Sequence, residues 1–221
     1  MLSRRFLPIV PLALFLIGSS ALNFSAVAQG KPSGRSGVYD SLLIGVDEKS
    51  GLVTGYFEES TGWDEQTKSP RFTCAFFLYG KLQGDVYQIT TWYPGLPHVP
   101  NVPDKIKGRL KFVTVNGLQK AHVKLEEEPG GCGMAHPFMP DGGDFELSTP
   151  GAWSSVRLVS ARRAYFHQAP DARTKEKTFV VRNNAVRVYK VQNGWAEAEF
   201  GGDKIFRGWL KESDLFAMSP R

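Results

Sequence analysis

Apolar and polar positions along the chain form short alternating runs, and no stretch keeps the 3.6-residue period of a helix. The run Asp85–Trp92 alternates with the two-residue period of a strand. Asn116-Gly117 lies between the runs Lys107–Val115 and Gln119–Leu125, and this dipeptide favours a hairpin turn with positive φ at both central residues. Runs of this kind recur up to residue 148, so the sequence predicts an antiparallel meander that closes as a barrel or a sandwich.

Thr149-Pro150-Gly151 interrupts this pattern, and a second group of strand-like runs follows. Asn193-Gly194 predicts another tight turn within this second group. The sequence therefore predicts an all-β protein with a β-meander domain over residues 38–150 and a smaller barrel domain over residues 151–221.

The second group carries motifs in an order that is typical of one family. Ala169-Pro170 follows its opening strand, and Asn193-Gly194-Trp195 provides a Gly-Trp step into a later strand. Gly208-Trp209-Leu210 and Ser213-Asp214-Leu215 match the closing signature G-W-[VL]-x-x-x-D-L. On these motifs, residues 158–216 resemble the bacterial SH3-like domain. The resemblance implies a small barrel in an exported envelope protein, which binds peptidoglycan or a protein that acts on it.

The opening of the first group carries a looser resemblance. Tyr39-Asp40 and the Gly-rich run Gly51–Phe57 resemble the first two strands of a lipocalin- or avidin-type meander (a calycin), extended here over residues 38–148. This resemblance implies a barrel with an interior cavity for a small ligand.

The first 28 residues predict a signal peptide that is cleaved near Ala28. Arg4 and Arg5 precede the apolar run Phe6–Ile17, and Ala26-Val27-Ala28 is the A-x-A pattern of a cleavage site. The apolar run is shorter than the ~20 residues that cross a bilayer, so we expect no retained membrane anchor. We expect a flexible leader over residues 29–37 and a mature protein in the periplasm or outside the cell.

Composition and net charge argue against one class of partner. The chain has 221 residues with 27 Lys+Arg and 22 Asp+Glu, and its 42% hydrophobic content is typical of globular proteins. Residues 1–28 contain two arginines and no acid, so the expected mature chain keeps a net charge of only +3. A surplus this small in an exported protein argues against a nucleic-acid partner.

Cys74 and Cys132 are the only cysteines, and in an oxidising compartment such a pair predicts a structural disulfide. Closing a loop of ~60 residues would stabilise the fold by about 4 kcal/mol. The alternative is that Cys132, in the Gly-rich stretch 130–136, is the nucleophile of a cysteine-dependent cell-wall peptidase with a histidine as base. We favour the disulfide and expect no enzymatic activity and no catalytic residues.

Four aromatic side chains are candidate contacts for a ligand or partner. They are Trp63, Trp92, Tyr93 and Trp195. The first three fall in or beside loops predicted over residues 58–70 and 93–105, and loops on a rigid barrel commonly carry binding function. Trp195 is predicted on a strand face with two glutamates, opposite Ala196 and Ala198. For each aromatic, the alternative is packing within its own domain.

The four histidines are His98, His122, His136 and His167, and no two have a metal-ligand spacing. The chain also lacks HExxH and CxxC, so we predict neither a metal nor a cofactor.

The sequence thus favours an exported, non-enzymatic binding protein of the cell envelope. Its partner would be peptidoglycan or an envelope or secreted protein, such as a wall hydrolase or toxin that it inhibits. The alternatives are the cysteine peptidase and a small-ligand carrier.

Overall fold

The computed structural model describes residues 35–93, 105–201 and 204–218. The signal peptide predicted over residues 1–28 lies outside the described residues. So do most of the predicted leader and nearly all of the loop predicted over residues 93–105. In the described part of the chain, no helix is long and apolar enough to cross a membrane.

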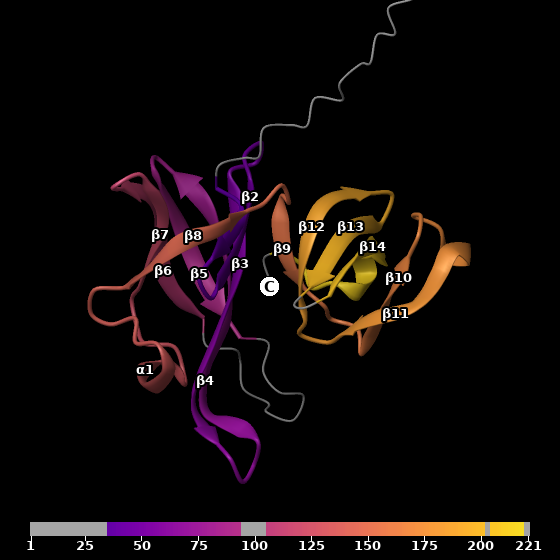
Figure 1. Ribbon diagram of the computed structural model, residues 1–221. Coiled ribbons are helices and arrows are strands. Elements are labelled where there is room, and N and C mark those ends of the chain that lie inside the picture. The colour runs from indigo at the N-terminus through magenta and orange to yellow at the C-terminus, as the bar shows by residue number, and fades with distance from the viewer. Residues whose placement is uncertain (1–34, 94–104, 202–203, 219–221) are drawn as a thin grey trace, which may run out of the picture. The chain divides into compact units, whose positions relative to one another are not determined.

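Eight antiparallel strands form a closed barrel in which each strand pairs with the next and β8 returns to β1 (Figure 1). The strands are β1 (Gly37–Tyr39), β2 (Leu42–Asp47), β3 (Leu52–Asp64), β4 (Ser69–Gln83), β5 (Val86–Trp92), β6 (Ile106–Val115), β7 (Leu118–Leu125) and β8 (Gly143–Pro150). The all-β prediction is confirmed, and the meander is a barrel rather than a sandwich.

Local turn chemistry sets the register of the β6–β7 hairpin. Asn116 and Gly117 have φ angles of 52° and 80°, the left-handed values that the dipeptide predicted. Val115 and Leu118 are consequently opposite each other, and this pair sets the register of all the other residue pairs in the hairpin. The same chemistry recurs in the second sheet, where Asn193 and Gly194 have φ angles of 50° and 76°.

Large side chains fill the interior of the barrel. Its fully buried members include Tyr39, Leu42, Ile44, Phe57, Leu78, Tyr87, Leu110, Phe138 and Phe145. Several of the rings contact one another edge to face, as Phe57 does with Phe138 at 5.4 Å between centroids. Packing by side chains is the usual state of the interior in a barrel of eight strands.

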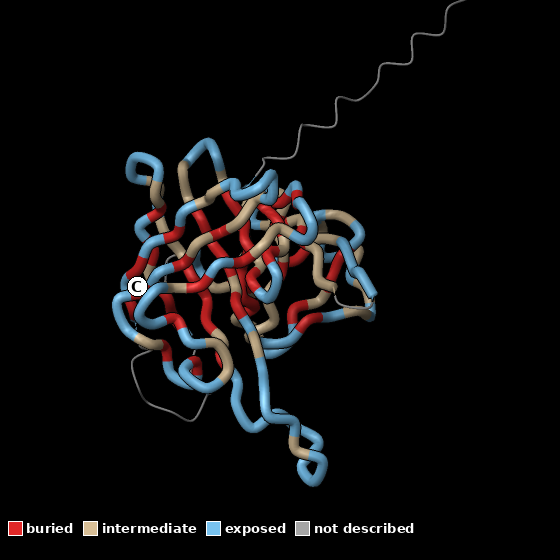
Figure 2. The backbone as a smooth tube through the Cα atoms, turned by 60° about the vertical axis from the view of Figure 1, so that its left-hand side comes forward, coloured by how far each residue is buried: buried red, intermediate tan, exposed pale blue. Residues whose placement is uncertain are grey.

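Strands β3 and β4 continue well beyond their neighbours as a two-stranded ribbon (Figures 1 and 2). The loop predicted over residues 58–70 is therefore wrong, because only residues 65–68 form the turn. Most residues of the projecting part are exposed on both faces, as the pale blue stretch of Figure 2 shows. A strand that is polar on both faces shows no apolar alternation, which is why the pattern indicated a loop.

The remaining strands form a six-stranded antiparallel sheet in the order β11-β10-β14-β13-β12-β9. They are β9 (Ser155–Leu158), β10 (Arg163–His167), β11 (Lys175–Val181), β12 (Ala185–Gln192), β13 (Trp195–Gly201) and β14 (Ile205–Lys211), with short 3-10 helices η1 (Ala172–Thr174) and η2 (Glu212–Asp214). Ala196 and Ala198 are completely buried in its core, which confirms the predicted alternation of β13.

The chain between the two sheets is held by specific contacts to β2 and β3. The indole Nε1 of Trp153 donates a hydrogen bond to the carbonyl of Ile44 at 2.7 Å. The main-chain N–H of Val156 donates to Oγ1 of Thr54 at 2.7 Å. Gly45 allows this approach, because a Cβ built there would lie 2.5 Å from the Cα of Ser155.

Candidate functional site

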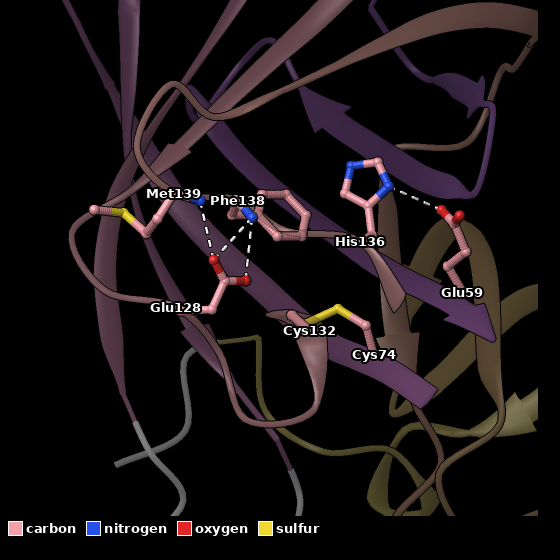
Figure 3. The surroundings of a disulfide bond; sticks show 7 residues. All are labelled: Glu59, Cys74, Glu128, Cys132, His136, Phe138 and Met139. Carbon is pink, nitrogen blue, oxygen red and sulfur yellow. Dashed lines mark hydrogen bonds and ion pairs between the residues drawn. A yellow bond between two sulfur atoms is a disulfide. The ribbon is translucent and has the colours of Figure 1, made fainter. Parts of the chain in front are cut away.

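A disulfide joins Cys74 of β4 to Cys132, the first residue of the one-turn helix α1 (Cys132–Ala135) (Figure 3). Both cysteines are completely buried, and the chain has no free cysteine. The predicted pairing is confirmed. Cys132 therefore carries no thiolate that could attack a substrate in this state.

The segment that follows β7, residues 126–142, is fastened to the barrel by more than the disulfide. The carboxylate of Glu128 accepts hydrogen bonds from the main-chain N–H groups of Phe138 and Met139, each at 3.0 Å (Figure 3). Phe138 is itself part of the barrel core. We call residues 126–142 the end segment, and its covalent, polar and apolar contacts make it a firm part of the scaffold.

His136 belongs to the end segment and connects it to β3. Its Nδ1 lies 3.0 Å from Oε2 of Glu59, and the two side chains point toward each other (Figure 3). The imidazole packs against three phenylalanines, with ring centroids 5.2 Å away for Phe57 and Phe145 and 5.0 Å for Phe138. The contact with Glu59 and the packing against the three rings together explain His136 as a packing residue that anchors the end segment.

The projecting part of the β3–β4 hairpin, residues 58–73, is called the ribbon here. The pairing of β2 with β3 ends at Phe57, and the pairing of β5 with β4 ends at Phe77. In the described part of the chain, the strands of the ribbon pair only with each other. Trp63 and Phe72 in the ribbon are 60% and 40% exposed, so it presents large apolar side chains to solvent.

The strand register places these two aromatic side chains on the same face of the ribbon. Trp63 lies opposite Pro70, and Phe72 lies opposite Thr61. Directly opposite residues of an antiparallel pair share a face, and so do residues two apart, which puts both rings on one face of the ribbon. The ring of Phe72 also lies over Gly62, where a Cβ would be 3.4 Å from its Cδ2 atom.

Asp64 orders the turn at the end of the ribbon. Its side chain accepts hydrogen bonds from the main-chain N–H groups of Gln66 at 2.8 Å and Thr67 at 3.2 Å, and from Nε of Arg71 at 3.1 Å. The N–H donors of Thr67 and Gln66, followed by the Arg71 guanidinium, hold the pKa of the Asp64 carboxyl below its usual range. Trp63 is therefore next to a turn that is ordered before any partner binds.

The other two barrel candidates differ in exposure. Trp92 is only 6% exposed and contacts Phe77 and Phe216, with ring centroids 6.3 and 5.1 Å away. Its burial favours the packing alternative over a role as a contact residue. Tyr93 is exposed at the end of β5, next to residues outside the described part of the chain.

Trp195 of β13 lies half-buried in the second sheet, with its ring 4.7 Å from that of His167. The two glutamates predicted beside it are in ion pairs. Glu197 contacts Arg207 at 2.9 Å, and Glu199 contacts Arg187 at 2.8 Å. The face that the sequence indicated as acidic is thus neutralised, and the four candidates are distributed over the ribbon, the end of β5 and β13.

Two exposed side chains near the candidates were not identified from the sequence. Phe72 on β4 is 40% exposed and Met134 on α1 is 67% exposed, and neither was among the four aromatic candidates. The position of Phe72 after the turn that follows Trp63 was the available signal, because a hairpin through this turn places the two residues on paired strands.

The described residues contain no group of three or more His, Cys, Asp or Glu side chains placed to hold a metal ion, and His98 lies outside them. The arrangement instead offers a disulfide-bonded barrel with a projecting aromatic ribbon. In comparisons with protein-family models, curated proteins and solved structures, nothing matches this chain.

Proposed function

We propose that this protein is an exported, non-enzymatic binding protein of the cell envelope, and that the ribbon is its contact surface for a partner protein. The observation that carries the proposal is the exposure of Trp63 and Phe72 on one face of an ordered hairpin. Exposed aromatic residues on a rigid support are typical of the residues that dominate binding energy in protein interfaces.

The order of the turn supports this role energetically. Asp64 already holds two main-chain N–H groups of the turn, so little conformational entropy remains to be lost when a partner binds. Charges of both signs surround the aromatic rings, among them Glu65, Lys68 and Arg71, which suits the polar rim of a protein interface.

The two alternatives from the sequence receive less support. A peptidase that uses Cys132 needs a free and accessible thiolate, whereas this sulfur is bonded and completely buried. A carrier of the calycin type needs interior space, whereas aromatic side chains such as Phe57, Phe138 and Phe145 fill the core of this barrel. The resemblance of residues 158–216 to bacterial SH3-like domains supports the location at the envelope.

Site-specific photo-crosslinking in native envelopes tests the proposal. A benzophenone amino acid at position 66, where Gln66 is exposed in the turn beside Trp63, is compared with the same group at position 118, where Leu118 is 47% exposed on the β6–β7 hairpin. We expect a discrete protein adduct from position 66 only. Trp63→Ala combined with Phe72→Ala should weaken capture of the adducted protein by roughly several hundred-fold, because central aromatic contacts contribute about 2 kcal/mol each.

Equal adducts from both positions, or none from position 66, would contradict the ribbon as the contact surface. The enzymatic alternative has its own test in the same preparation. Titration of the non-reduced protein with a thiol reagent should find no reactive cysteine, whereas a reactive Cys132 would favour the peptidase.

A further inference from the structure

The β10–β11 hairpin of the second sheet carries an excess of basic side chains. Between Arg162 and Arg182 there are six basic residues and two acidic ones, a local net charge of +4. Arg173 is paired with Asp171 at 2.6 Å. The other five basic residues have no carboxylate within ion-pair distance among the residues that the structure describes. They are Arg162, Arg163, Lys175, Lys177 and Arg182.

The barrel also has a basic hairpin, β6–β7, in which two of the five Lys and Arg side chains have an acidic partner. Lys111 lies 2.8 Å from Asp85, and Lys120 lies 3.7 Å from Glu146. Among the described residues, five of six Lys and Arg side chains on the β10–β11 hairpin lack a carboxylate partner, compared with three of five on β6–β7.

The exposed face of β10–β11 combines these cations with aromatic rings. Tyr165 lies opposite Phe179, with ring centroids 5.5 Å apart. The guanidinium of Arg163 lies 4.9 Å from the centre of the Phe179 ring, and Nζ of Lys175 lies 3.5 Å from that of Tyr165. Each ring thus already has a cation over one face, which leaves less of it free for stacking with a sugar or a base.

Apolar side chains on the same face remain exposed. Phe179 and Val181 are 40% and 42% exposed, and they alternate with the buried Val180 along β11. Because residues two apart share a face, Lys175, Lys177, Phe179 and Val181 all point outward. We call this surface the basic face; it lies on an edge strand of the sheet.

Arg162 and Arg163 add a place for a discrete anion at the end of this face. The two arginines line an open cleft of about 270 Å³. Guanidinium groups bind phosphate oxygens in a bidentate manner.

We propose that the basic face binds peripherally to a bilayer that contains anionic phospholipid. Unbalanced Arg and Lys beside exposed Phe and Val are the combination that attaches a protein to the interface of such a bilayer. The cations are attracted by the headgroup phosphates, and Phe179 and Val181 bury apolar area at the boundary with the acyl chains. This surface is separate from the ribbon, so the inference does not depend on the proposed function.

Vesicle co-sedimentation tests the proposal with residues 29–221, which include the whole compact unit Lys31–Arg221. We expect binding to vesicles of equal parts phosphatidylglycerol and phosphatidylcholine, much weaker binding to phosphatidylcholine alone, and loss of binding at high salt. The variant R162Q/R163Q/K175Q/K177Q should bind the anionic vesicles several hundred-fold more weakly, because each cation near the surface contributes roughly fivefold.

The matched control removes the same number of charges from the barrel, as K81Q/K107Q/R109Q/K124Q. These four side chains are exposed and also have no carboxylate partner in the described part of the chain. We expect binding within about threefold of the unchanged protein. Phe179→Ser keeps every charge and should still weaken binding several-fold. Circular dichroism establishes that each variant is folded.

Three outcomes would overturn the proposal. The first is equal binding to the two kinds of vesicle. The second is an equal loss in the basic-face variant and the barrel control, which would show a non-specific effect of net charge. The third is tight binding of soluble polyphosphate through the same residues without binding to vesicles, which would identify a phosphate polymer as the ligand instead.

Discussion

Removal of the Cys74–Cys132 disulfide gives the most direct test of the scaffold that carries the ribbon. The bond joins residues that are 58 positions apart in sequence. For a closed loop of this length, the restriction of the unfolded chain is worth about 4 kcal/mol at 25 °C. A domain of ordinary stability has only about 5–15 kcal/mol in total, so we expect a protein that still folds but is much less stable.

The measurement is urea unfolding followed by tryptophan fluorescence, with and without a reductant. Reduction leaves both sulfur atoms in place, so the loss in unfolding free energy reports the crosslink alone. Cys74→Ala combined with Cys132→Ala should lose about 1 kcal/mol more for each buried sulfur, since both sites are completely buried. The dependence of the free energy on urea should also become steeper, because the uncrosslinked chain exposes more surface when it unfolds.

A loss of less than about 1 kcal/mol on reduction would refute this reasoning. It would mean that the reduced, unfolded chain already keeps residues 74 and 132 close together, so that the crosslink restricts it little further. Two free thiols in the non-reduced protein would refute it more directly.

Three further predictions concern single residues. Gly45→Ala should lower the unfolding free energy by about 1–3 kcal/mol, because the new Cβ would lie 2.5 Å from the Cα of Ser155; Gly130→Ala, with nothing within 4 Å of the new Cβ, is the near-neutral control in the same urea assay. Glu128→Ala should lose about 1–3 kcal/mol, since its carboxylate accepts two main-chain N–H groups, and Glu128→Gln should lose less. Asp214→Asn should raise the midpoint of thermal unfolding at pH 7, because burial raises the pKa of this carboxyl and the charged form opposes folding. That gain should vanish below the ordinary carboxyl pKa of 3.8, where the carboxyl is protonated in both states, and a gain that persists there would contradict the electrostatic cause.

Features that depend on neighbouring residues could be predicted from the sequence. The turns at Asn116-Gly117 and Asn193-Gly194 follow from the tolerance of these residues for positive φ. The alternation of β13 predicted which of its side chains enter the core, because the period of a strand alone decides this. The disulfide could be predicted because only two cysteines are present.

Features that depend on residues far apart in the sequence could not be predicted from the sequence. The ribbon was interpreted as a loop, because its strands are exposed on both faces and only their pairing with each other maintains them. Trp92 looked like a loop aromatic, and its burial is set by Phe77 and by Phe216, more than a hundred residues away. The glutamates beside Trp195 looked free until Arg187 and Arg207 were placed on the neighbouring strands.

The amino-acid sequence by itself thus determined the strand class, the tight turns and the identity of the covalent crosslink. These follow from backbone preferences and residue counts that need no knowledge of the rest of the chain. Only the tertiary structure decided which aromatic rings face solvent and which cations remain without a carboxylate. Exposure and charge balance are properties of neighbours in space, and antiparallel pairing makes neighbours of residues that the sequence keeps far apart.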